Sequence, residues 1–228
     1  MNDELKEAAE KAVKTVTDTV TTASMIGPEK KENWVLELVK MLIIVAVVVF
    51  IIDDVIFINA RIPSASMEDT IMTKDRIFGL RMAYGINLDL FGHDVLTKKL
   101  KDPERYDIVI FRYPDDESQL FIKRIIGLPG ETIEITDGHV YVVNDDGTKT
   151  QLRDDFIREP EYGTTDNPFH DGVYQVPEDS YFMLGDNRNN SKDSRFWRNT
   201  YVTFDQIVGK AILRYWPLNK IGLIKGGG

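Results

Sequence analysis

Hydrophobic and polar positions divide the chain into three zones. Residues 1–33 are polar, and they either remain a solvated tail or form a mildly amphipathic helix over 4–20. An uncharged run, MLIIVAVVVFII, follows at 41–52. From residue 55 onward, short alternating or β-branched runs are separated by Gly, Pro and Asp turns, a pattern typical of β-strands. The pattern predicts a tail, an apolar segment at 34–54 and a β-rich domain at 55–228.

The apolar segment allows two interpretations. A membrane-spanning helix needs roughly 20 mostly apolar residues, whereas a run of about 10–14 also fits a buried core helix. With an interfacial Trp34 and an extended Lys40 side chain, the whole segment reaches spanning length, which favours a transmembrane anchor. Positive charges precede the uncharged run 41–52 and negative charges follow it, so the N-terminus is expected in the cytoplasm: Lys30, Lys31 and Lys40, then Asp53 and Asp54.

The third zone predicts a mainly β domain with long irregular loops. Asp137-Gly138 lies between two alternating runs and is a strong hairpin turn signal, because both residues tolerate positive φ. Asp145–Gly147 is a second turn signal. The predicted strands lie within 106–113, 119–128, 132–143, 181–184 and 207–216.

Composition excludes several classes of protein. The net charge is −9, which argues against nucleic acid as the main partner. There are no cysteines, so disulfides and thiolate metal sites are excluded. The three histidines lack the close spacing that places two ligands on one helix face, so we expect neither a metal nor another cofactor.

Two segments carry candidate chemistry: RIPSASMEDTI at 61–71 and FIKRIIGLPGE at 121–131. Ser66 offers a nucleophile. Lys123 lies in an apolar run, and desolvation lowers the pKa of a lysine from about 10.4 toward the range in which it works as a general base. Alone, each motif is more often structural, a loop serine or a surface Lys-Arg pair. A third segment, GDNRNNSKDSR at 185–195, is dense enough in donors and acceptors to build a network around a catalytic group.

With these segments in order, and with YDIVIF at 106–111 and WPLNKIG at 216–222, the chain resembles bacterial type I signal peptidases over nearly all of 34–222. These are membrane-bound Ser-Lys endopeptidases. The resemblance implies a curved β-sheet catalytic domain with a smaller β-rich cap at roughly 130–180. It also implies a single-pass protein of the cell membrane, near the secretion translocon. The protein would contact the lipid bilayer and cut signal-peptide-bearing preproteins after a small-x-small motif.

Residue by residue, the resemblance implies that Ser66 is the nucleophile and Lys123 the general base. Ser64 and the Ser66 N–H would form the oxyanion hole, and Ser191 would orient the Lys123 amine. Two structural ion pairs, Arg124–Asp186 and Arg195–Asp193, would support the loop. Four residues would form the walls of the substrate pockets: Ile62, Met67, Phe121 and Ile122. One departure is Asp69, which stands where the family commonly has proline and is expected to loosen the turn after the nucleophile.

Two rival functions remain. A self-cleaving Ser-Lys repressor would need an N-terminal helix-turn-helix, whereas this N-terminus leads into an apolar segment. A membrane-anchored binding protein without catalysis is the other rival. The simultaneous presence of Ser64, Ser66, Lys123 and Ser191 argues against it, and covalent capture by a serine-acylating inhibitor would separate the two.

Overall fold

The computed structural model describes residues 11, 14, 15, 33–51, 56–90, 93–159 and 171–226. The chain divides into two compact units, Met1–Val48 and Val49–Gly228. Most of the predicted tail, 1–33, lies outside the described residues.

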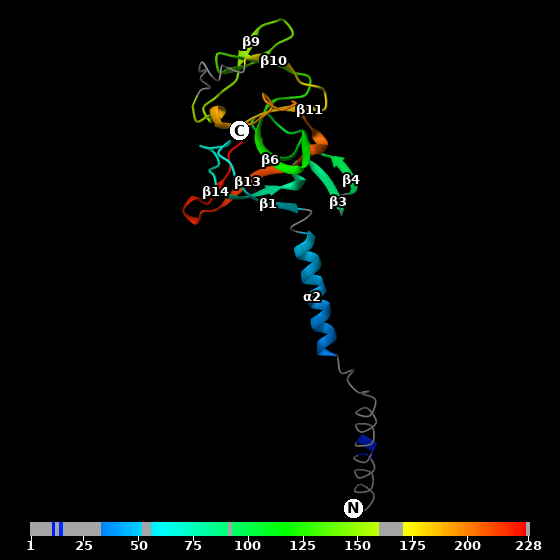
Figure 1. Ribbon diagram of the computed structural model, residues 1–228. Coiled ribbons are helices and arrows are strands. Elements are labelled where there is room, and N and C mark those ends of the chain that lie inside the picture. Colours follow the sequence, from blue (N-terminus) through cyan, green and yellow to red (C-terminus); the bar gives the residue numbers. More distant parts are fainter. Residues whose placement is uncertain are drawn as a thin grey trace, which may run out of the picture. The chain divides into compact units, whose positions relative to one another are not determined.

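The apolar segment forms helix α2, Trp34–Ile51 (Figure 1). Its large apolar side chains from Trp34 to Val49 are exposed. The predicted anchor runs on through 52–54, and these residues lie outside the described residues. Among the helices of the described residues, none is both long and apolar enough to cross a membrane.

The second unit is mainly β, as predicted, and its largest sheet has eight strands. The order is β1-β2-β13-β5-β6-β11-β12, with β14 beside β13. Figure 1 shows β6 strongly curved within this sheet. The strands are β1 Phe57–Arg61, β2 Arg76–Leu80, β5 Ile108–Tyr113, β6 Asp116–Gly127, β11 Ser180–Leu184, β12 Val202–Thr203, β13 Ile207–Trp216 and β14 Gly222–Leu223.

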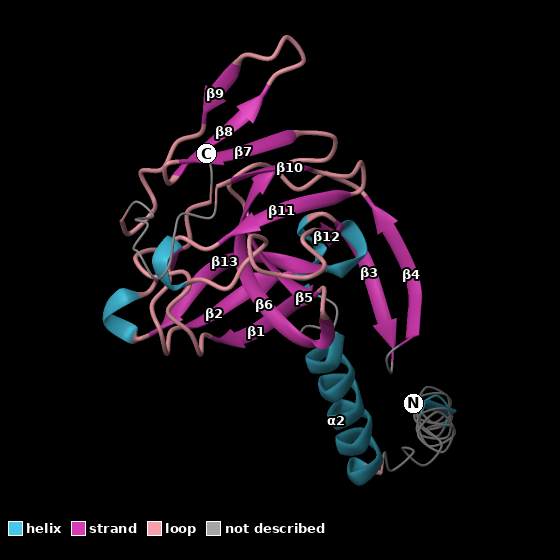
Figure 2. Ribbon diagram, turned by 45° about the horizontal axis from the view of Figure 1, so that its top comes forward, coloured by secondary structure: helices cyan, strands magenta, loops and turns pink. Residues whose placement is uncertain are grey.

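Two smaller sheets complete this unit (Figure 2). A four-stranded sheet has the order β10-β7-β8-β9, and a two-stranded hairpin joins β3 to β4. The strands are β3 Gly85–Leu90, β4 His93–Lys99, β7 Thr132–Thr136, β8 His139–Val143, β9 Lys149–Gln151 and β10 Gly172–Gln175. The four-stranded sheet occupies the range in which the cap was expected. The described residues also include the short 3-10 helices η2 Arg81–Ala83, η3 Arg188–Asn190, η4 Phe204–Gln206 and η5 Leu218–Lys220.

Both predicted turns are confirmed. Asp137 and Gly138 have φ of 52° and 76° and join β7 to β8, with Thr136 opposite His139. Positive φ at both central residues is what the tightest hairpins require. Gly147, with φ of 79°, turns the chain from β8 into β9.

The core consists of three buried apolar clusters. The cluster beneath the loop of Ser66 includes Ile62, Met67 and Ile71, packed against Ile108 and Ile110 of β5. A second cluster is aromatic and surrounds Trp197, and the third joins β7, β8 and β11. Since β5 and β6 are buried along much of their length, side chains on both faces of β6 are held away from solvent.

Candidate active site

Ser66 lies in the loop between β1 and β2. The loop closes at its base through two backbone hydrogen bonds, from Ile62 N–H to the Asp75 carbonyl (3.0 Å) and from Lys74 N–H to the Ile62 carbonyl (2.8 Å). Met67 and Ile71 are fully buried and anchor the loop from beneath. Ser66 is therefore held on a loop that packs against the core, and it is only 5% exposed.

Lys123 reaches Ser66 from β6. Its amine Nζ lies 2.7 Å from Ser66 Oγ and donates to the Ile122 carbonyl at 3.0 Å. The residue is 3% exposed. Burial lowers the pKa of Lys123 to about 8, although Asp193 and Asp186 act to raise it. The structure thus brings together a hydroxyl and an amine that is deprotonated far more easily than an exposed lysine.

Ser64 lies beside the same hydroxyl. Its Oγ is 3.4 Å from Ser66 Oγ, and the residue is exposed. A hydroxyl on the open side of the nucleophile can donate to an oxygen that develops negative charge there.

Ser191 differs from the expectation. The residue is buried, and its hydroxyl lies near enough to Asp193 to help lower the pKa of that carboxyl. The expected hydrogen bond to the Lys123 amine is not formed; the amine contacts Ser66 Oγ and the Ile122 carbonyl instead. Ser191 is nevertheless close to the nucleophile loop: a β-carbon added at Gly185 would lie 2.2 Å from Ser191 Oγ and 2.5 Å from the Ser66 carbonyl. Only glycine at 185 allows this approach.

Arg124 points to the opposite face of β6, as alternation along a strand requires. Its Nε and Nη2 donate to the two oxygens of Asp186 at 2.8 and 2.7 Å, and both side chains are 1% exposed. Arg195 forms the same kind of fork on Asp193, at 2.8 and 2.9 Å, again fully buried. Burial acts to raise the pKa of Asp193, but Arg195, together with the Gly185 N–H and the Ser191 hydroxyl, outweighs burial and lowers it.

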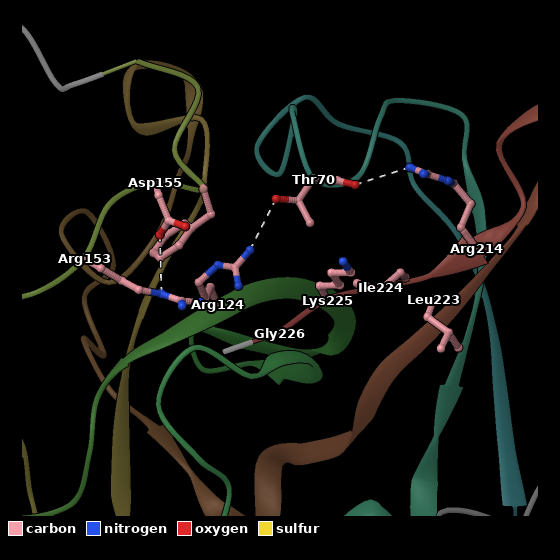
Figure 3. Close-up of a pocket in the computed structure, with 10 residues that line it drawn as sticks. Thr70, Arg124, Arg153, Asp155, Arg214, Leu223, Ile224, Lys225 and Gly226 are labelled. Atoms are coloured by element: carbon pink, nitrogen blue, oxygen red, sulfur yellow. Dashed lines mark hydrogen bonds and ion pairs between the residues drawn. The ribbon is translucent and has the colours of Figure 1, made fainter. Parts of the chain in front are cut away.

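Thr70 connects these elements, and the sequence reasoning did not single it out. Its hydroxyl donates to Asp186 Oδ2 at 2.6 Å and accepts from Arg124 Nη2 at 3.3 Å, while its carbonyl accepts from Arg214 Nη1 at 3.3 Å. Figure 3 shows Thr70 between Arg124 and Arg214, at the edge of a cavity of about 390 Å³ that does not contain Ser66 or Lys123. The nucleophile loop is thereby fixed to both β6 and β13.

Asn187 is a second residue that the sequence reasoning left without a role. Its backbone N–H donates to the Ser66 carbonyl, and its side-chain amide donates to the Ala65 carbonyl, both at 3.1 Å. The polar segment 185–195 is therefore bonded directly to the backbone of the nucleophile. The density of polar residues in that segment was the available signal, but it did not distinguish Asn187 from its neighbours.

The turn after the nucleophile has an unusual backbone. Asp69 has φ of 48°, in the left-handed region. Proline, which fixes φ near −65°, could not occupy that conformation. The aspartate that departs from the family pattern therefore belongs to a turn of different geometry.

Two adjoining hollows flank the Ser66–Lys123 pair. One, of about 410 Å³, contains Ser66, Lys123 and Ser64, with Phe121 and Ile122 as apolar lining. The other, of about 250 Å³, is lined by residues that include Ile62, Phe121 and Ile122. Met67, expected to be a fourth wall, lines neither hollow, because its side chain is fully buried in the cluster beneath the loop.

Comparisons with known proteins identify the family. The sequence profile of a family described as "Signal peptidase, peptidase S26" matches residues 35–216. A probable signal peptidase I-2 of Synechocystis is 34% identical over 198 residues, covering 85% of this chain and 78% of the relative. A signal peptidase I of Leptolyngbya laminosa is 36% identical, covering 71% and 70%.

Among solved structures, the crystal structure of a signal peptidase I from Enterococcus faecalis is 31% identical. It covers 49% of this chain and 98% of that one, with a TM-score of 0.37, too low to support the fold assignment. The family profile and the sequence relatives suffice without it: the chain belongs to the signal peptidase family, peptidase S26, and is a serine peptidase.

Proposed function

We propose that this protein removes N-terminal signal peptides from secreted preproteins, with Ser66 as nucleophile and Lys123 as general base. The observation that carries the proposal is the 2.7 Å separation of Ser66 Oγ and Lys123 Nζ, in a buried site where the pKa of the lysine falls to about 8. A general base works best when its pKa lies near the working pH.

The proposed reaction proceeds through an ester intermediate. Neutral Lys123 takes the Ser66 hydroxyl proton while Oγ bonds to the scissile carbonyl carbon. The resulting oxyanion accepts hydrogen bonds from the Ser66 N–H and the Ser64 hydroxyl. The C–N bond then breaks, and Lys123 returns the proton to the leaving amine. Water, deprotonated by Lys123, attacks the ester carbon. The ester bond then breaks, Lys123 returns that proton to Ser66 Oγ, and the released carboxylic acid loses its own proton to solvent.

Ser191 is proposed to position the amine during this cycle. Its hydroxyl is buried beside Asp193, and both the hydroxyl and the Ser66 carbonyl lie against Gly185, so it belongs to the network around the amine. The two carboxylates that act to raise the pKa of Lys123 are each held by an arginine, Asp186 by Arg124 and Asp193 by Arg195. These forks keep both carboxylates directed toward their arginines.

The substrate is proposed to bind as an added strand. β11 pairs with β6 only at Arg124, Ile125 and Gly127, so the Gln119–Ile122 part of β6 has no β11 partner on that side. An extended peptide can bond to such an edge and place alternate side chains in pockets. The two hollows of about 250 and 410 Å³ would take the two small residues of a small-x-small motif, with Ile62, Phe121 and Ile122 as walls.

We also propose that residues 34–54 anchor the protein in the cell membrane, with residues 1–33 in the cytoplasm and 55–228 outside, near the translocon. The exposed apolar side chains of α2 and the change of charge sign across the segment support this arrangement.

The test is cleavage of a preprotein by the detergent-solubilised full chain, with the new N-terminus read by mass spectrometry. Ser66→Ala and Lys123→Ala should each abolish cleavage. Because nucleophile and base act as one unit, the double variant should be scarcely worse than either single one. Ser118→Ala and Lys149→Ala change the same residue types at exposed positions and should remain active. Substantial turnover by folded Ser66→Ala would contradict the assignment.

Ser64→Ala tests the oxyanion donor separately. Losing one such donor typically lowers kcat about 10²–10³-fold. Ser64→Thr retains the hydroxyl and should recover part of the activity. An unchanged kcat in Ser64→Ala would remove Ser64 from the site.

A further inference from the structure

A third hollow continues the row formed by the two at the active site. We call the hollow of about 250 Å³ at Asn59–Pro63 the upstream hollow, and the one of about 410 Å³ around Ser66 the central hollow. The downstream hollow, of about 360 Å³, is lined by Asn189–Lys192 and Phe196.

Each neighbouring pair of hollows has lining residues in common. The upstream and central hollows share Pro63 and Leu120–Ile122, whereas the central and downstream hollows share Asn190 and Lys192. The upstream and downstream hollows have no lining residue in common. The hollow that holds Ser66 therefore has one neighbour on the β6 side and another on the side of the 185–195 segment. A peptide that occupies the first two before its scissile bond must leave Ser66 toward the third.

Lys192 gives the downstream end a positive charge. It is exposed, and its amine lies 5.6 Å from the centre of the Tyr113 ring. No ion pair of Lys192 occurs in the described parts of the chain, and no carboxylate lines the central or downstream hollow. Among the described residues that line these two hollows, the other ionisable side chain is Lys123, which must be neutral to act as a base.

Two carboxylates near this end are already bonded elsewhere. Asp115 accepts from Tyr113 and from the backbone N–H groups of Arg198 and Asn199. Asp116 accepts from Ser118 and Gln119. Neither forms an ion pair with Lys192, so its ammonium group remains available to a substrate.

We infer that the downstream hollow receives the first residues of the mature protein, and that Lys192 favours an acidic side chain there over a basic one. This inference rests on the proposed function and adds a charge preference on the product side of the cut. Lys192 is exposed, so its effect is a modest one: an exposed ion pair corresponds to roughly a two- to fivefold preference for Glu over neutral Gln. Repulsion between Lys192 and a substrate lysine adds to the difference in kcat/KM between the Glu and Lys peptides. The preference should weaken with salt, because exposed charges are screened.

The experiment compares peptides that share one cleavage site and carry Glu, Gln or Lys at each of the first three positions after the cut. The measured quantity is the ratio of kcat/KM for the Glu and Lys peptides, within one enzyme preparation. Such a ratio does not depend on how much of the variant is folded. The full chain should prefer Glu at one or more of these positions, Lys192→Gln should bring the ratio close to one, and Lys192→Glu should invert it.

Lys220→Glu is the matched control. It makes the same change of net charge at an exposed residue that lines none of the three hollows, and it should keep the wild-type ratio. A Lys192→Glu enzyme that still prefers Glu as strongly as the wild type would overturn the inference about Lys192. The proposed function would still stand in that case if Ser66→Ala abolishes cleavage. If the folded wild type cuts none of the peptides and no preprotein, both are overturned together.

Discussion

At the residue scale, the site depends on one buried amine. An ammonium group loses more hydration than a neutral amine when it is buried, and this difference brings the pKa of Lys123 to about 8. The hydrogen bond to Ser66 then connects the proposed base directly to the hydroxyl that it would deprotonate. The surrounding arginines serve a different purpose, since each is paired with its own carboxylate.

The first prediction concerns pH. Below a pKa of about 8, Lys123 carries a proton and cannot accept another, so kcat/KM should rise as pH increases through about 8. Initial rates with a soluble peptide from pH 6 to 10 would show the inflection. An inflection near the ordinary lysine value of about 10.4 would mean that Lys123 is not desolvated in solution.

A second residue-scale prediction follows from the left-handed conformation of Asp69. Asp69→Pro forces φ near −65° at a position where the structure has 48°, and should lower the free energy of unfolding by more than about 1 kcal/mol. Asp69→Asn should be nearly neutral, because asparagine tolerates left-handed φ. Urea unfolding of both variants is the measurement. Equal stabilities would show that the turn readily adopts the geometry that proline requires.

At the element scale, β6 carries the proposed base and the arginine that supports the site on opposite faces. Lys123 faces Ser66, and Arg124 faces Asp186 and Thr70. Because the strand is buried on both faces here, the charge of Arg124 depends on Asp186 for compensation.

Breaking that pair should be costly. Asp186→Asn leaves a buried guanidinium without its anion, and removing one partner of a buried pair typically costs about 3–5 kcal/mol. Arg124→Met combined with Asp186→Leu should cost less than the sum of the two single changes, because no uncompensated charge remains. Asp155→Asn, which removes the partner of Arg153 from an exposed pair, should change stability by less than about 1 kcal/mol. A similar loss in Asp155→Asn and Asp186→Asn by urea unfolding would contradict this reasoning.

The sequence predicted the strands whose alternation is strong and long. The runs that became β5–β8, β11 and β13 are recognisable from periodicity, and both positive-φ turns from Asp-Gly pairs. The strands β1 to β4, β9, β10, β12 and β14 were not foreseen. Short segments such as FINAR and RIFGL have little periodicity of their own and acquire their pairing from distant partners.

Prediction of the site residues depended on more than pattern. Alternation along β6 explains why Lys123 and Arg124 face apart, but nothing local indicates that Ser66, 57 positions away, lies at hydrogen-bond distance. That pairing came from the family resemblance. Thr70 was missed because its contacts, with Asp186, Arg124 and Arg214, all lie far away in sequence.

At the scale of the whole molecule, the proposed function separates catalysis from attachment. The residues of the candidate site all lie between Ile62 and Arg195, in the second of the two units. The exposed apolar helix α2 contributes none of them.

Deleting residues 1–54 should therefore leave a domain that cleaves soluble peptides with kcat close to that of the full chain. On a preprotein embedded in vesicles, the full chain should be faster, because anchoring both molecules raises their effective concentration. The measurement is the rate of the full chain divided by the rate of the truncated protein, taken once with the soluble peptide and once with the vesicle-embedded preprotein. A folded, truncated protein that is inactive on the soluble peptide would contradict the separation of catalysis from attachment.

The open edge of β6 has a consequence for timing in secretion. A substrate that lies along Gln119–Ile122 must be extended for several residues on both sides of Ser66, so no folded domain can lie close to the cut. Processing then competes with the folding of the passenger. Passengers whose first helix or strand begins immediately after the cleavage site, and which fold rapidly, would escape processing, whereas a short unstructured leader in the mature chain would keep the site accessible.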